Sequence, residues 1–518
     1  MQKTYLYITV FSTGLTALAV ELSASRLLGG VFGTSNLVWA TIIGLILVYL
    51  AAGYLLGGYW ADRSPRAQTM YSILAWAALA AGLVPFAARP VLRLAADAFD
   101  QLQVGILFGS FTGVLVLFCI PVTLMGMISP FALRLAIDDV QTSGKVSGRL
   151  YSISTLGSFI GTFLPPLVLI PLLGTTQTFL SFSLFLCLVA LVGLWLNGAR
   201  KRALWLAWIP LLIVVLMFLS AGKPIKTSQG QIYETESAYN YIQVLEQDGY
   251  RLLRLNEGQG IHSIWHPTDL DYAGPWEQFL AAPFYYPNYA PQDLGRIAIV
   301  GLAAGTLSRQ ATEVFGPVPI DGFEIDPAII EVGREFFDMN QPNLNAIPQD
   351  GRWGIARSPQ TYDLVAIDAY RPPYIPWHLT TREFFQEVAD HLSDRGVVAM
   401  NVGSDPGDTR LLDGLVATLQ SVFPSVYKMA VPNTFNFLLY ATKQPTRLED
   451  LHANYVSLAA RQDVHPLLLE SLKRLIENQE EPGWGGEVFT DDHSPVEWIT
   501  NNMVLSYLFL NEEENILR

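Results

Sequence analysis

The residues best suited to chemistry lie in the second half of the chain, at the ends of short apolar runs. Gly301, Ala303 and Gly305 follow the run at 296–300, and Glu324 ends the next such run. Small residues in such a turn let the backbone approach a ligand at the start of a helix. An acid at this spacing is typical of a carboxylate that binds a ribose diol. The turn alone fits a structural bend equally well, whereas the turn and the acid together indicate a nucleoside site.

Further residues could complete such a site. Asp350 and Gly351 precede another apolar run and could reach an adenine, although this pair alone is also an ordinary turn. Asp368 ends the run at 363–368, close to Tyr370, and is expected to face the same cleft. The alternative interpretation of Asp368 is a helix N-cap or a loop carboxylate.

The elements that must position these residues follow from the pattern around them. Buried-strand runs alternate with helical stretches, and the runs lie at residues 296–300, 320–324, 363–368 and 396–401. This alternation predicts a mostly parallel α/β sheet that binds ligands at the carboxyl ends of its strands.

A different pattern precedes this sheet. Residues 232–265 alternate in short apolar runs, and Gln-Asp-Gly at 247–249 separates the runs at 241–245 and 250–255. Such a turn between two alternating runs predicts a β-hairpin, and a small β-domain is the simplest interpretation.

The first part of the chain is apolar and mildly basic, in contrast to the rest. Up to residue 221 there are 12 Lys and Arg against 6 Asp and Glu; the whole chain has 32 and 46, so the remainder has 20 and 40. Apolar runs long enough to cross about 30 Å of hydrocarbon recur in this part. They predict a multi-pass domain of about seven helices, at residues 5–28, 37–59, 70–87, 104–128, 151–173, 178–196 and 203–219.

Loop charge bears on the orientation and on possible partners. Basic residues gather after the second, fourth and sixth runs, and the positive-inside rule therefore places the N-terminus in the cytoplasm. Seven spans put the polar half outside the cytoplasm, whereas an eighth or a missing span would put it inside. The side of the membrane that the polar half faces therefore stays open. The acidic polar half argues against nucleic acid as a partner. Cys119 and Cys187 lie in apolar runs without a metal-binding spacing, and no metal is expected.

Residues 231–497 resemble spermidine synthase, and more closely the membrane-fused members of the polyamine aminopropyltransferase family. The stretch at 236–242 is similar to the family's Glu-Ser-Pro-Tyr-Gln, and residues 301–309 occupy the place of its Gly-rich loop. Phe-Glu-Ile-Asp-Pro at 323–327 is similar to its acid-bearing second strand. The strings at 375–384 and 490–497 are typical of the membrane-fused branch and are the most specific signals.

The resemblance implies a Rossmann-like, methyltransferase-type fold and aminopropyl transfer from decarboxylated S-adenosylmethionine to an amine acceptor such as a polyamine. S-adenosylmethionine itself is the alternative cosubstrate, and no metal is implied. The implied partners are the lipid bilayer of the cell membrane and, because the family commonly dimerises, a second copy of the chain. We therefore expect a transmembrane helical domain at 1–221, a small β-hairpin domain at 222–290 and an α/β domain at 291–518.

Site residues can be carried over position by position. Asp368 and Tyr370 are expected to be catalytic: Asp368 falls where the family has the Asp that takes a proton from the attacking amine, and Tyr370 lies beside it. Residues expected to bind the cosubstrate are Gly301, Ala303, Gly305, Glu324, Asp326, Asp350 and Gly351. Residues expected to bind the acceptor substrate are Tyr239, Asn240, His262, Tyr272, His378, Asp492 and Glu497.

The chain also departs from the family pattern. Ala304 stands where the family has a loop Asp, and Ala-Gly at 273–274 replaces the His-Glu that normally follows the Tyr at the place of Tyr272. Residues 369–373 lack the second Asp of the usual Asp-x-x-Asp-Pro. The nucleoside half of the site is therefore expected to be retained, and the acceptor half to be altered.

Two other functions stay open. Methyl transfer from S-adenosylmethionine uses the same kind of sheet, and the change at Ala304 would suit a changed donor. A non-catalytic domain that binds a nucleoside or a polyamine and is coupled to the membrane bundle is the rival from another class. In that case Glu21 and Arg26 would matter more than Asp368. A stretch at 53–63 resembles a loop motif of major facilitator transporters, and it supports the helical topology more than transport.

Overall fold

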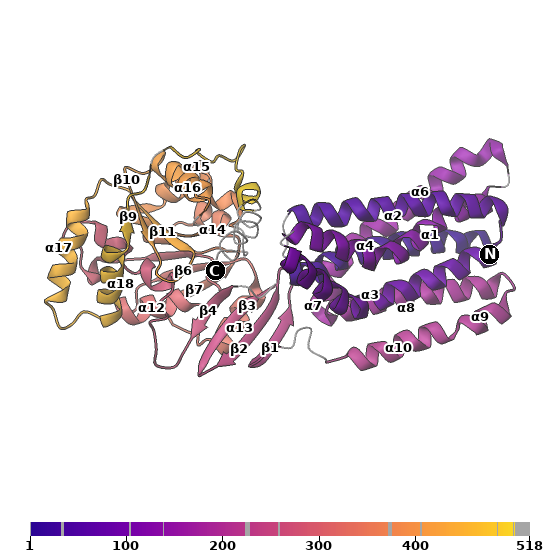
Figure 1. The fold of residues 1–518 in the computed structure, drawn as a ribbon, viewed down its shortest axis with the longest axis horizontal. Helices are drawn as coiled ribbons and strands as arrows, with labels where there is room; N and C mark the ends of the chain where they lie inside the picture. Colours follow the sequence, from indigo (N-terminus) through magenta and orange to yellow (C-terminus); the bar gives the residue numbers. More distant parts are fainter. Residues whose placement is uncertain are drawn as a thin grey trace. The chain divides into compact units, whose positions relative to one another are not determined.

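The chain forms two compact units in the computed structural model, whose secondary structure is drawn in Figure 1. The first unit contains residues 1–227 and 235–241, and the second contains residues 228–234 and 242–518. The structure describes residues 2–32, 36–102, 105–137, 139–222, 228–256, 260–370, 375–404, 407–483, 485–500 and 502.

Apolar helices make up the first unit and run side by side as a bundle (Figure 1). They are α1 Gln2–Phe32, α2 Asn36–Arg63, α3 Ala67–Leu102, α4 Gly105–Gly126, α5 Ile128–Ala136, α6 Ser143–Leu164, α7 Ile170–Leu173, α8 Thr175–Leu196, α9 Arg200–Leu206 and α10 Trp208–Ser220. A π-helical segment, Pro165–Leu169, joins α6 to α7, since prolines lack the N–H that a regular helical ladder requires.

Seven helical stretches of the described residues are long and apolar enough to cross a membrane, as predicted. They are Thr4–Leu28, Val38–Arg63, Ala67–Ala88, Phe111–Ala136, Val140–Leu173, Thr175–Leu196 and Arg200–Ser220. The fourth ends later and the fifth begins earlier than the sequence pattern suggested. Hydropathy falls at charged residues such as Arg134 and Lys145, whereas the helices continue through both of them.

Paired glycines explain how closely the helices pack. A side chain at Gly157 or Gly161 of α6 would overlap the backbone of α1 at Phe11 and Leu15. Small residues spaced by four are the usual means of close helix contact where lipid surrounds the bundle.

A second glycine pair lies in α2. A side chain at Gly53 would overlap the backbone of Thr123, and one at Gly57 that of Met127. These glycines belong to the stretch that resembles a transporter loop motif, and here they serve the contact of α2 with the end of α4.

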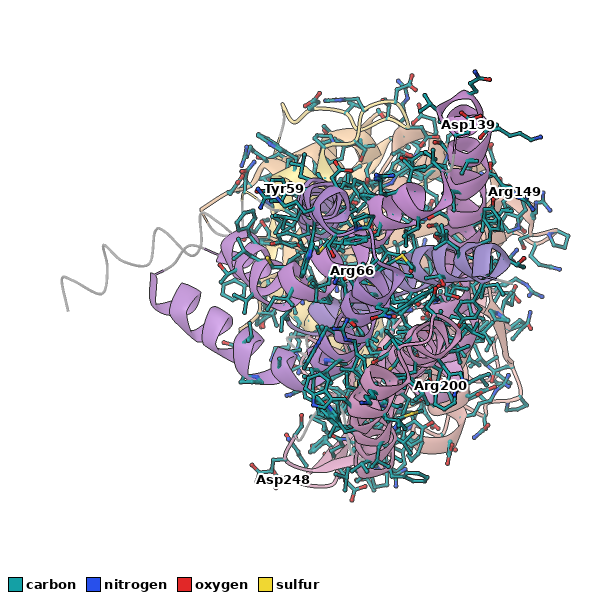
Figure 2. The ribbon with its side chains drawn as sticks, turned by 90° about the vertical axis from the view of Figure 1, so that its right-hand side faces the viewer. Tyr59, Arg66, Asp139, Arg149, Arg200 and Asp248 are labelled. Atoms are coloured by element: carbon teal, nitrogen blue, oxygen red, sulfur yellow. The ribbon has the colours of Figure 1, made fainter. Side chains whose placement is uncertain are left out.

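Basic residues gather at one end of the helical unit, the end that faces the viewer in Figure 2. Arg66, Arg149 and Arg200 are labelled there; Arg66 immediately precedes α3, Arg149 lies in the second turn of α6, and Arg200 is the first residue of α9. Arg26, near the other end of the unit's first helix, donates to the carbonyl oxygen of Ser237, 3.1 Å away and within the same unit.

The second unit begins with a four-stranded sheet in the order β1-β2-β3-β4. Its strands are β1 Gln231–Glu236, β2 Tyr241–Gln247, β3 Tyr250–Leu255 and β4 Ile261–Trp265. β2 and β3 pair as an antiparallel hairpin in which Gln247 is opposite Tyr250, so the predicted hairpin is confirmed. Asp248 and Gly249 form its turn with φ of 52° and 86°, which Gly and Asp tolerate best.

An eight-stranded sheet in the order β12-β10-β11-β9-β8-β5-β6-β7 follows. Its strands are β5 Ile297–Val300, β6 Ile320–Glu324, β7 Leu344–Pro348, β8 Tyr362–Ile367, β9 Leu392–Gly403, β10 Ser425–Ala430, β11 Asn436–Thr442 and β12 Gln479–Glu480. The strands from β7 to β9 are parallel; β5, β6, β8 and β9 correspond to the four predicted runs, whereas β7 was not predicted. β11, β10 and β12 add antiparallel pairs on one side of the sheet.

Helices cover both faces of this sheet (Figure 1). They are α11 Trp276–Phe279, α12 Thr306–Phe315, α13 Pro327–Phe336, α14 Gly351–Arg357, α15 Arg382–Asp390, α16 Arg410–Gln420, α17 Leu448–Ala459 and α18 Pro466–Glu477. Along β5 the side chains alternate between two apolar cores. Ile297 and Ile299 pack with α12, α17 and α18, while Ala298 and Val300 pack with α14, α15 and α16. The second unit is therefore a three-layered, Rossmann-like α/β domain.

Candidate functional site

The chain reverses direction across the sheet between β5 and β8. It runs from β5 outward through β6 and β7, and then returns to place β8 on the other side of β5. Open α/β sheets bind their ligands at such a switch point, outside the carboxyl ends of the strands. The loop after β5 and the residue after β8 meet there: a Cβ on Gly301 would lie 2.6 Å from the carbonyl oxygen of Asp368.

The loop after β5 has the conformation that small residues allow. Gly301, Ala303 and Gly305 have φ of 87°, 48° and 86°, in the left-handed region. Glu324, at the end of β6, accepts a hydrogen bond from the Ala303 N–H at 3.0 Å. The predicted glycine-rich turn and the predicted acid are therefore in direct contact.

Glu324 is buried, and burial raises the pKa of its carboxyl to about 7, against the opposing effect of its backbone donors. The second oxygen accepts from the Asp326 N–H at 3.1 Å. The Ile325 N–H is a third donor, and two carboxylate oxygens together can accept about four hydrogen bonds. A carboxylate fixed in this way can still accept hydrogen bonds from a diol.

The other two predicted acids of the nucleoside site cap helices. Asp326 is fully buried and accepts from the Ala328 N–H at 3.1 Å at the start of α13. Asp350 accepts from the Trp353 N–H at 3.0 Å at the start of α14, and its other oxygen lies 2.9 Å from His378 Nε2.

Asp350 was expected to bind the cosubstrate and His378 the acceptor substrate, yet the two side chains are hydrogen-bonded to each other. The hydrogen bond from His378 lowers the pKa of the Asp350 carboxyl below its usual range. Gly351 follows directly and has no room for a side chain, since a Cβ there would overlap Val300 of β5. Helix α14 therefore packs closely on the strand that carries the loop.

Asp368 lies half-buried at the end of β8, where two side chains donate to its carboxylate. Asn401 Nδ2 is 2.8 Å from Oδ1, and the Trp276 indole also donates. Burial raises the pKa of Asp368 to about 7, although both hydrogen bonds act in the opposite direction. A carboxyl with this pKa can exchange a proton near neutral pH.

Sequence reasoning missed both donors. Asn401 ends a strand that the pattern had predicted, and a polar residue at the end of the strand next to Asp368 was an available signal. Asn401 Oδ1 is buried and has no hydrogen-bond partner among the described residues. Trp276 gave no signal, because nothing local distinguishes it from other aromatic residues.

Tyr370 follows Asp368, and its hydroxyl oxygen accepts from the N–H of Gly403, the last residue of β9. Burial, together with the nearby Asp368 charge, raises the pKa of this phenol above its ordinary value. The predicted departure at residues 371–373 lies outside the described residues.

Strand β4 contacts the nucleoside loop. Ser263 Oγ accepts from the Ala304 N–H at 2.9 Å, and Ala304 is buried among apolar side chains of β2, β3 and α13. The neighbouring His262 has a pKa lowered to about 4 by burial, so its ring is neutral at pH 7. Its Nε2 is buried without a partner among the described residues.

Tyr272 is held by hydrogen bonds on both sides. Its hydroxyl donates to the Asp269 carbonyl at 2.9 Å, and its N–H donates to the Glu277 carboxylate at 2.9 Å. Glu277 also accepts from the Gly274 N–H at 3.0 Å, so this buried acid fixes the Ala-Gly segment that departs from the family pattern.

The remaining predicted acceptor residues belong to both units. Tyr239 and Asn240 belong to the first unit, where the Ser237 hydroxyl oxygen accepts from both of their N–H groups. Asp492 is exposed, and Glu497 is half-buried with a pKa raised by burial. Within the described residues, no group of three or more His, Cys, Asp or Glu could hold a metal ion.

Comparison with known proteins gives relatives that match up to about half of the chain. The chain matches no family model. It is 31% identical over 281 residues to a probable polyamine aminopropyl transferase of Bifidobacterium longum, covering 51% of this chain and 61% of that relative. It is 30% identical over 233 residues to a polyamine aminopropyltransferase of Vibrio vulnificus, covering 43% and 75%. It is 28% identical over 160 residues to an eEF1A lysine and N-terminal methyltransferase of Mus musculus, covering 29% and 23%.

Proposed function

Because the chain belongs to the polyamine aminopropyltransferase family, we propose that it is a membrane-anchored enzyme that transfers an aminopropyl group from decarboxylated S-adenosylmethionine to an amine. The observation that carries the proposal is the meeting of Asp368 with the loop at Gly301, at the switch point of the sheet. There a proton acceptor and a ribose-binding acid lie on strands that flank β5.

The donor half of the site is supported by Glu324. Its carboxylate, held by backbone N–H groups, would accept hydrogen bonds from the ribose hydroxyls of the donor. The left-handed φ of Gly301 and Gly305 turns the chain from β5 into the start of α12, the helix end at which the donor would bind. Asp350, fixed at the start of α14, would contact the base of the nucleoside.

In the proposed reaction Asp368 acts as the general base. The nitrogen of a neutral amine forms a bond to the carbon beside the sulfonium, and the C–S bond breaks with its electron pair staying on sulfur. The products are an aminopropylated amine and methylthioadenosine. The surplus proton on the new ammonium passes to Asp368, whose pKa of about 7 allows it to be ionised before the reaction and protonated after it.

Asn401 would help to bind the attacking amine. Its Nδ2 holds Asp368 at 2.8 Å, and its buried Oδ1 is an unused acceptor. An amine N–H is a donor that would satisfy it. The Asp368 carboxylate and the Asn401 amide would then orient the nitrogen of the attacking amine from two directions.

The acceptor is proposed to differ from that of an ordinary spermidine synthase. Ala304 is buried against the hairpin sheet and offers no carboxylate to a cationic group. Glu277 is engaged by the N–H groups of Tyr272 and Gly274. Methyl transfer from S-adenosylmethionine is the second candidate, favoured by the same change at Ala304.

The helical unit is proposed to anchor the enzyme in the cell membrane. Seven helices of sufficient length and the gathering of basic residues at one end support insertion in a lipid bilayer. We also propose that the domain boundaries lie at residues 221 and 290 and that the protein forms a homodimer.

Donor binding tests the proposed function. We would titrate the full-length protein, purified in detergent, with decarboxylated S-adenosylmethionine, S-adenosylmethionine and methylthioadenosine, using calorimetry. The wild type is expected to prefer the decarboxylated donor. Glu324→Gln should weaken binding at least about tenfold, since hydrogen bonds to a charged group contribute about 1.5–3 kcal/mol. Glu331→Gln, on the exposed face of α13, is the matched control.

Other outcomes have clear meanings. Preference for S-adenosylmethionine would favour methyl transfer. Absence of binding to a folded wild-type protein would refute the enzymatic proposal, whereas donor binding without turnover with any amine would favour the non-catalytic alternative.

A further inference from the structure

The segment at 489–496, here called the strap, is anchored by buried apolar side chains at both ends. Phe489 and Val496 are fully buried in the core that also contains α15 and α16. The Phe489 N–H donates to Thr418 Oγ1 at 2.9 Å, and its carbonyl accepts from the Arg382 N–H at 2.8 Å. The strap is therefore fixed at two points, with polar residues between them.

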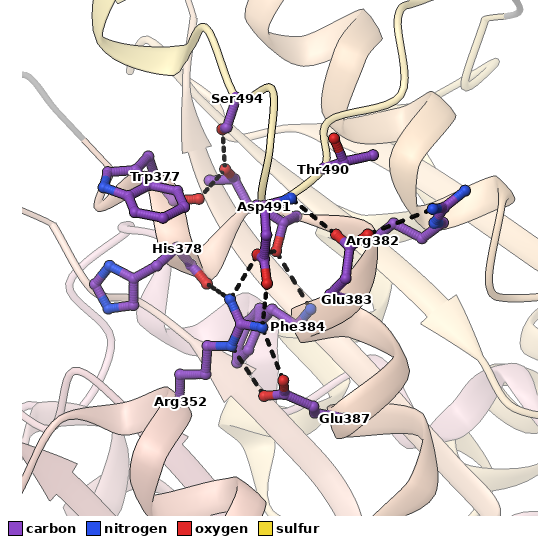
Figure 3. A network of polar contacts seen from close by, with 12 residues as sticks. Arg352, Trp377, His378, Arg382, Glu383, Phe384, Glu387, Thr490, Asp491 and Ser494 are labelled. Atoms are coloured by element: carbon purple, nitrogen blue, oxygen red, sulfur yellow. Dashed lines mark hydrogen bonds and ion pairs between the residues drawn. The ribbon is translucent and has the colours of Figure 1, made fainter.

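Arg352 of α14 holds the middle of the strap (Figure 3). Its Nη1 and Nη2 each lie 2.8 Å from one oxygen of Asp491. Its Nε and Nη2 lie 2.9 and 2.8 Å from the two oxygens of Glu387 on α15. Nη1 also donates to the His378 carbonyl at 3.2 Å, so every N–H of the guanidinium has an acceptor.

The strap is tied to the segment at 377–384 by further hydrogen bonds. Asp491 accepts from the Thr381 hydroxyl at 2.7 Å, and its own N–H donates to Glu383 at 3.0 Å. Thr380 and Ser494 lie 3.1 Å apart, hydroxyl to hydroxyl. The two strings that the sequence singled out as most specific are therefore bound to each other.

His378 links this network to the donor half of the site. Its carbonyl is held by Arg352, and its imidazole Nε2 lies 2.9 Å from Asp350. Arg352 and Asp350 are two positions apart, at the start of the same helix, which packs closely on β5 through Gly351. The same short segment thus fixes both the backbone and the side chain of His378.

We propose that Arg352 and Asp491 are positioning residues: by clamping the strap against residues 377–384, they hold His378 on Asp350 and so set the affinity for the nucleoside donor. This inference rests on the proposed function of the donor site. Asp368 has its own donors, Asn401 and Trp276, and does not depend on the clamp for its orientation. Loss of the clamp should therefore weaken donor binding while the chemical step is kept.

The test compares variants of the full-length protein in detergent, with methylthioadenosine binding and steady-state kinetics as readouts. Asp491→Asn and Arg352→Lys each remove the bidentate fork, because neither new side chain can form two parallel charged hydrogen bonds. The matched control is Asp463→Asn, which breaks an equally bidentate pair with Arg461 on the exposed loop between α17 and α18.

We expect both clamp variants to raise the Kd for methylthioadenosine and the donor KM at least about tenfold, with kcat and the acceptor KM changed less than about twofold. Asp491→Glu, which keeps the charge, should recover part of the affinity, and the control should behave as the wild type. A merely structural role would lower the melting temperature without this separation of KM from kcat.

Two results would overturn the inference, and only one of them would also overturn the proposed function. If the wild type binds the nucleoside and folded clamp variants bind it equally well, the positioning role is wrong and the proposed function stands. If the folded wild type binds no nucleoside at all, both fail together.

Discussion

Replacing Asp368 with Asn keeps the shape of the side chain and removes its ionisation. Asn401 and Trp276 donate to the carboxylate, and an amide oxygen can still accept from one of them. Turnover should fall by two orders of magnitude or more, since general-base catalysis typically contributes about 10²–10⁴-fold. The same substitution should raise stability, because the ionised carboxylate is held in a partly buried position.

The magnitude follows from the pKa. Burial raises the pKa of Asp368 from 3.8 to about 7, so the folded protein binds this proton more tightly than the unfolded chain does. The stabilisation by this carboxyl is then fully present below about pH 4 and is lost as the pH rises through about 7. A shift of about three pH units at about 1.4 kcal/mol each gives a loss of about 4 kcal/mol. Asn does not titrate, so above about pH 8 the variant should gain this amount less the about 1–3 kcal/mol lost with the donor that the amide leaves unpaired.

The assay is thermal unfolding of the full-length wild type and Asp368→Asn in detergent from pH 5 to pH 8.5, followed by intrinsic fluorescence. The difference in melting temperature should grow with pH and level off above about pH 8. Wild-type turnover should rise about tenfold between pH 6 and pH 8 as Asp368 ionises. A pH-independent difference in melting temperature, or a variant as active as the wild type, would refute this reasoning.

Two further predictions concern glycines. Gly301→Ala should destabilise the protein by about 2 kcal/mol or more and reduce turnover, because φ is 87° and the new Cβ would lie 2.6 Å from the Asp368 carbonyl oxygen; unfolding and rate measurements check this, and an unchanged protein would contradict it. Gly157→Val should prevent close packing of α6 on α1 at Phe11, with loss of monodisperse protein in detergent, whereas Gly148→Val, at an open position of the same helix, should be tolerated.

The sequence predicted the local elements well, because each depends on a local pattern. The seven apolar stretches, the hairpin with its turn at Asp248 and Gly249, and the parallel strands that carry Glu324 and Asp368 could all be derived from periodicity and turn residues. The additional antiparallel strands β10 to β12 were not anticipated. The buried apolar run at 438–441 in β11 was an available signal, whereas β12 at the edge is only two residues long and has no pattern to read.

What the sequence could not predict depends on contacts between distant residues. Arg352 and Asp491 are 139 positions apart, and Asn401 and Asp368 are 33 apart. Spacing along the chain says nothing about such pairs, because they form only when helices and strands pack. The motif at 490–497 is recognisable in the sequence, but its contact with Arg352 of α14 can be seen only in the three-dimensional structure.

The central claim is that this chain transfers an aminopropyl group with Asp368 as the base. The most direct measurement incubates the full-length protein with decarboxylated S-adenosylmethionine and a panel of amines, and quantifies methylthioadenosine and the aminopropylated product by mass spectrometry. We predict that equal amounts of the two products form with at least one amine, and that Asp368→Asn forms neither at a comparable rate. Absence of both products with a folded wild type that binds the donor, or undiminished formation by Asp368→Asn, would contradict the account.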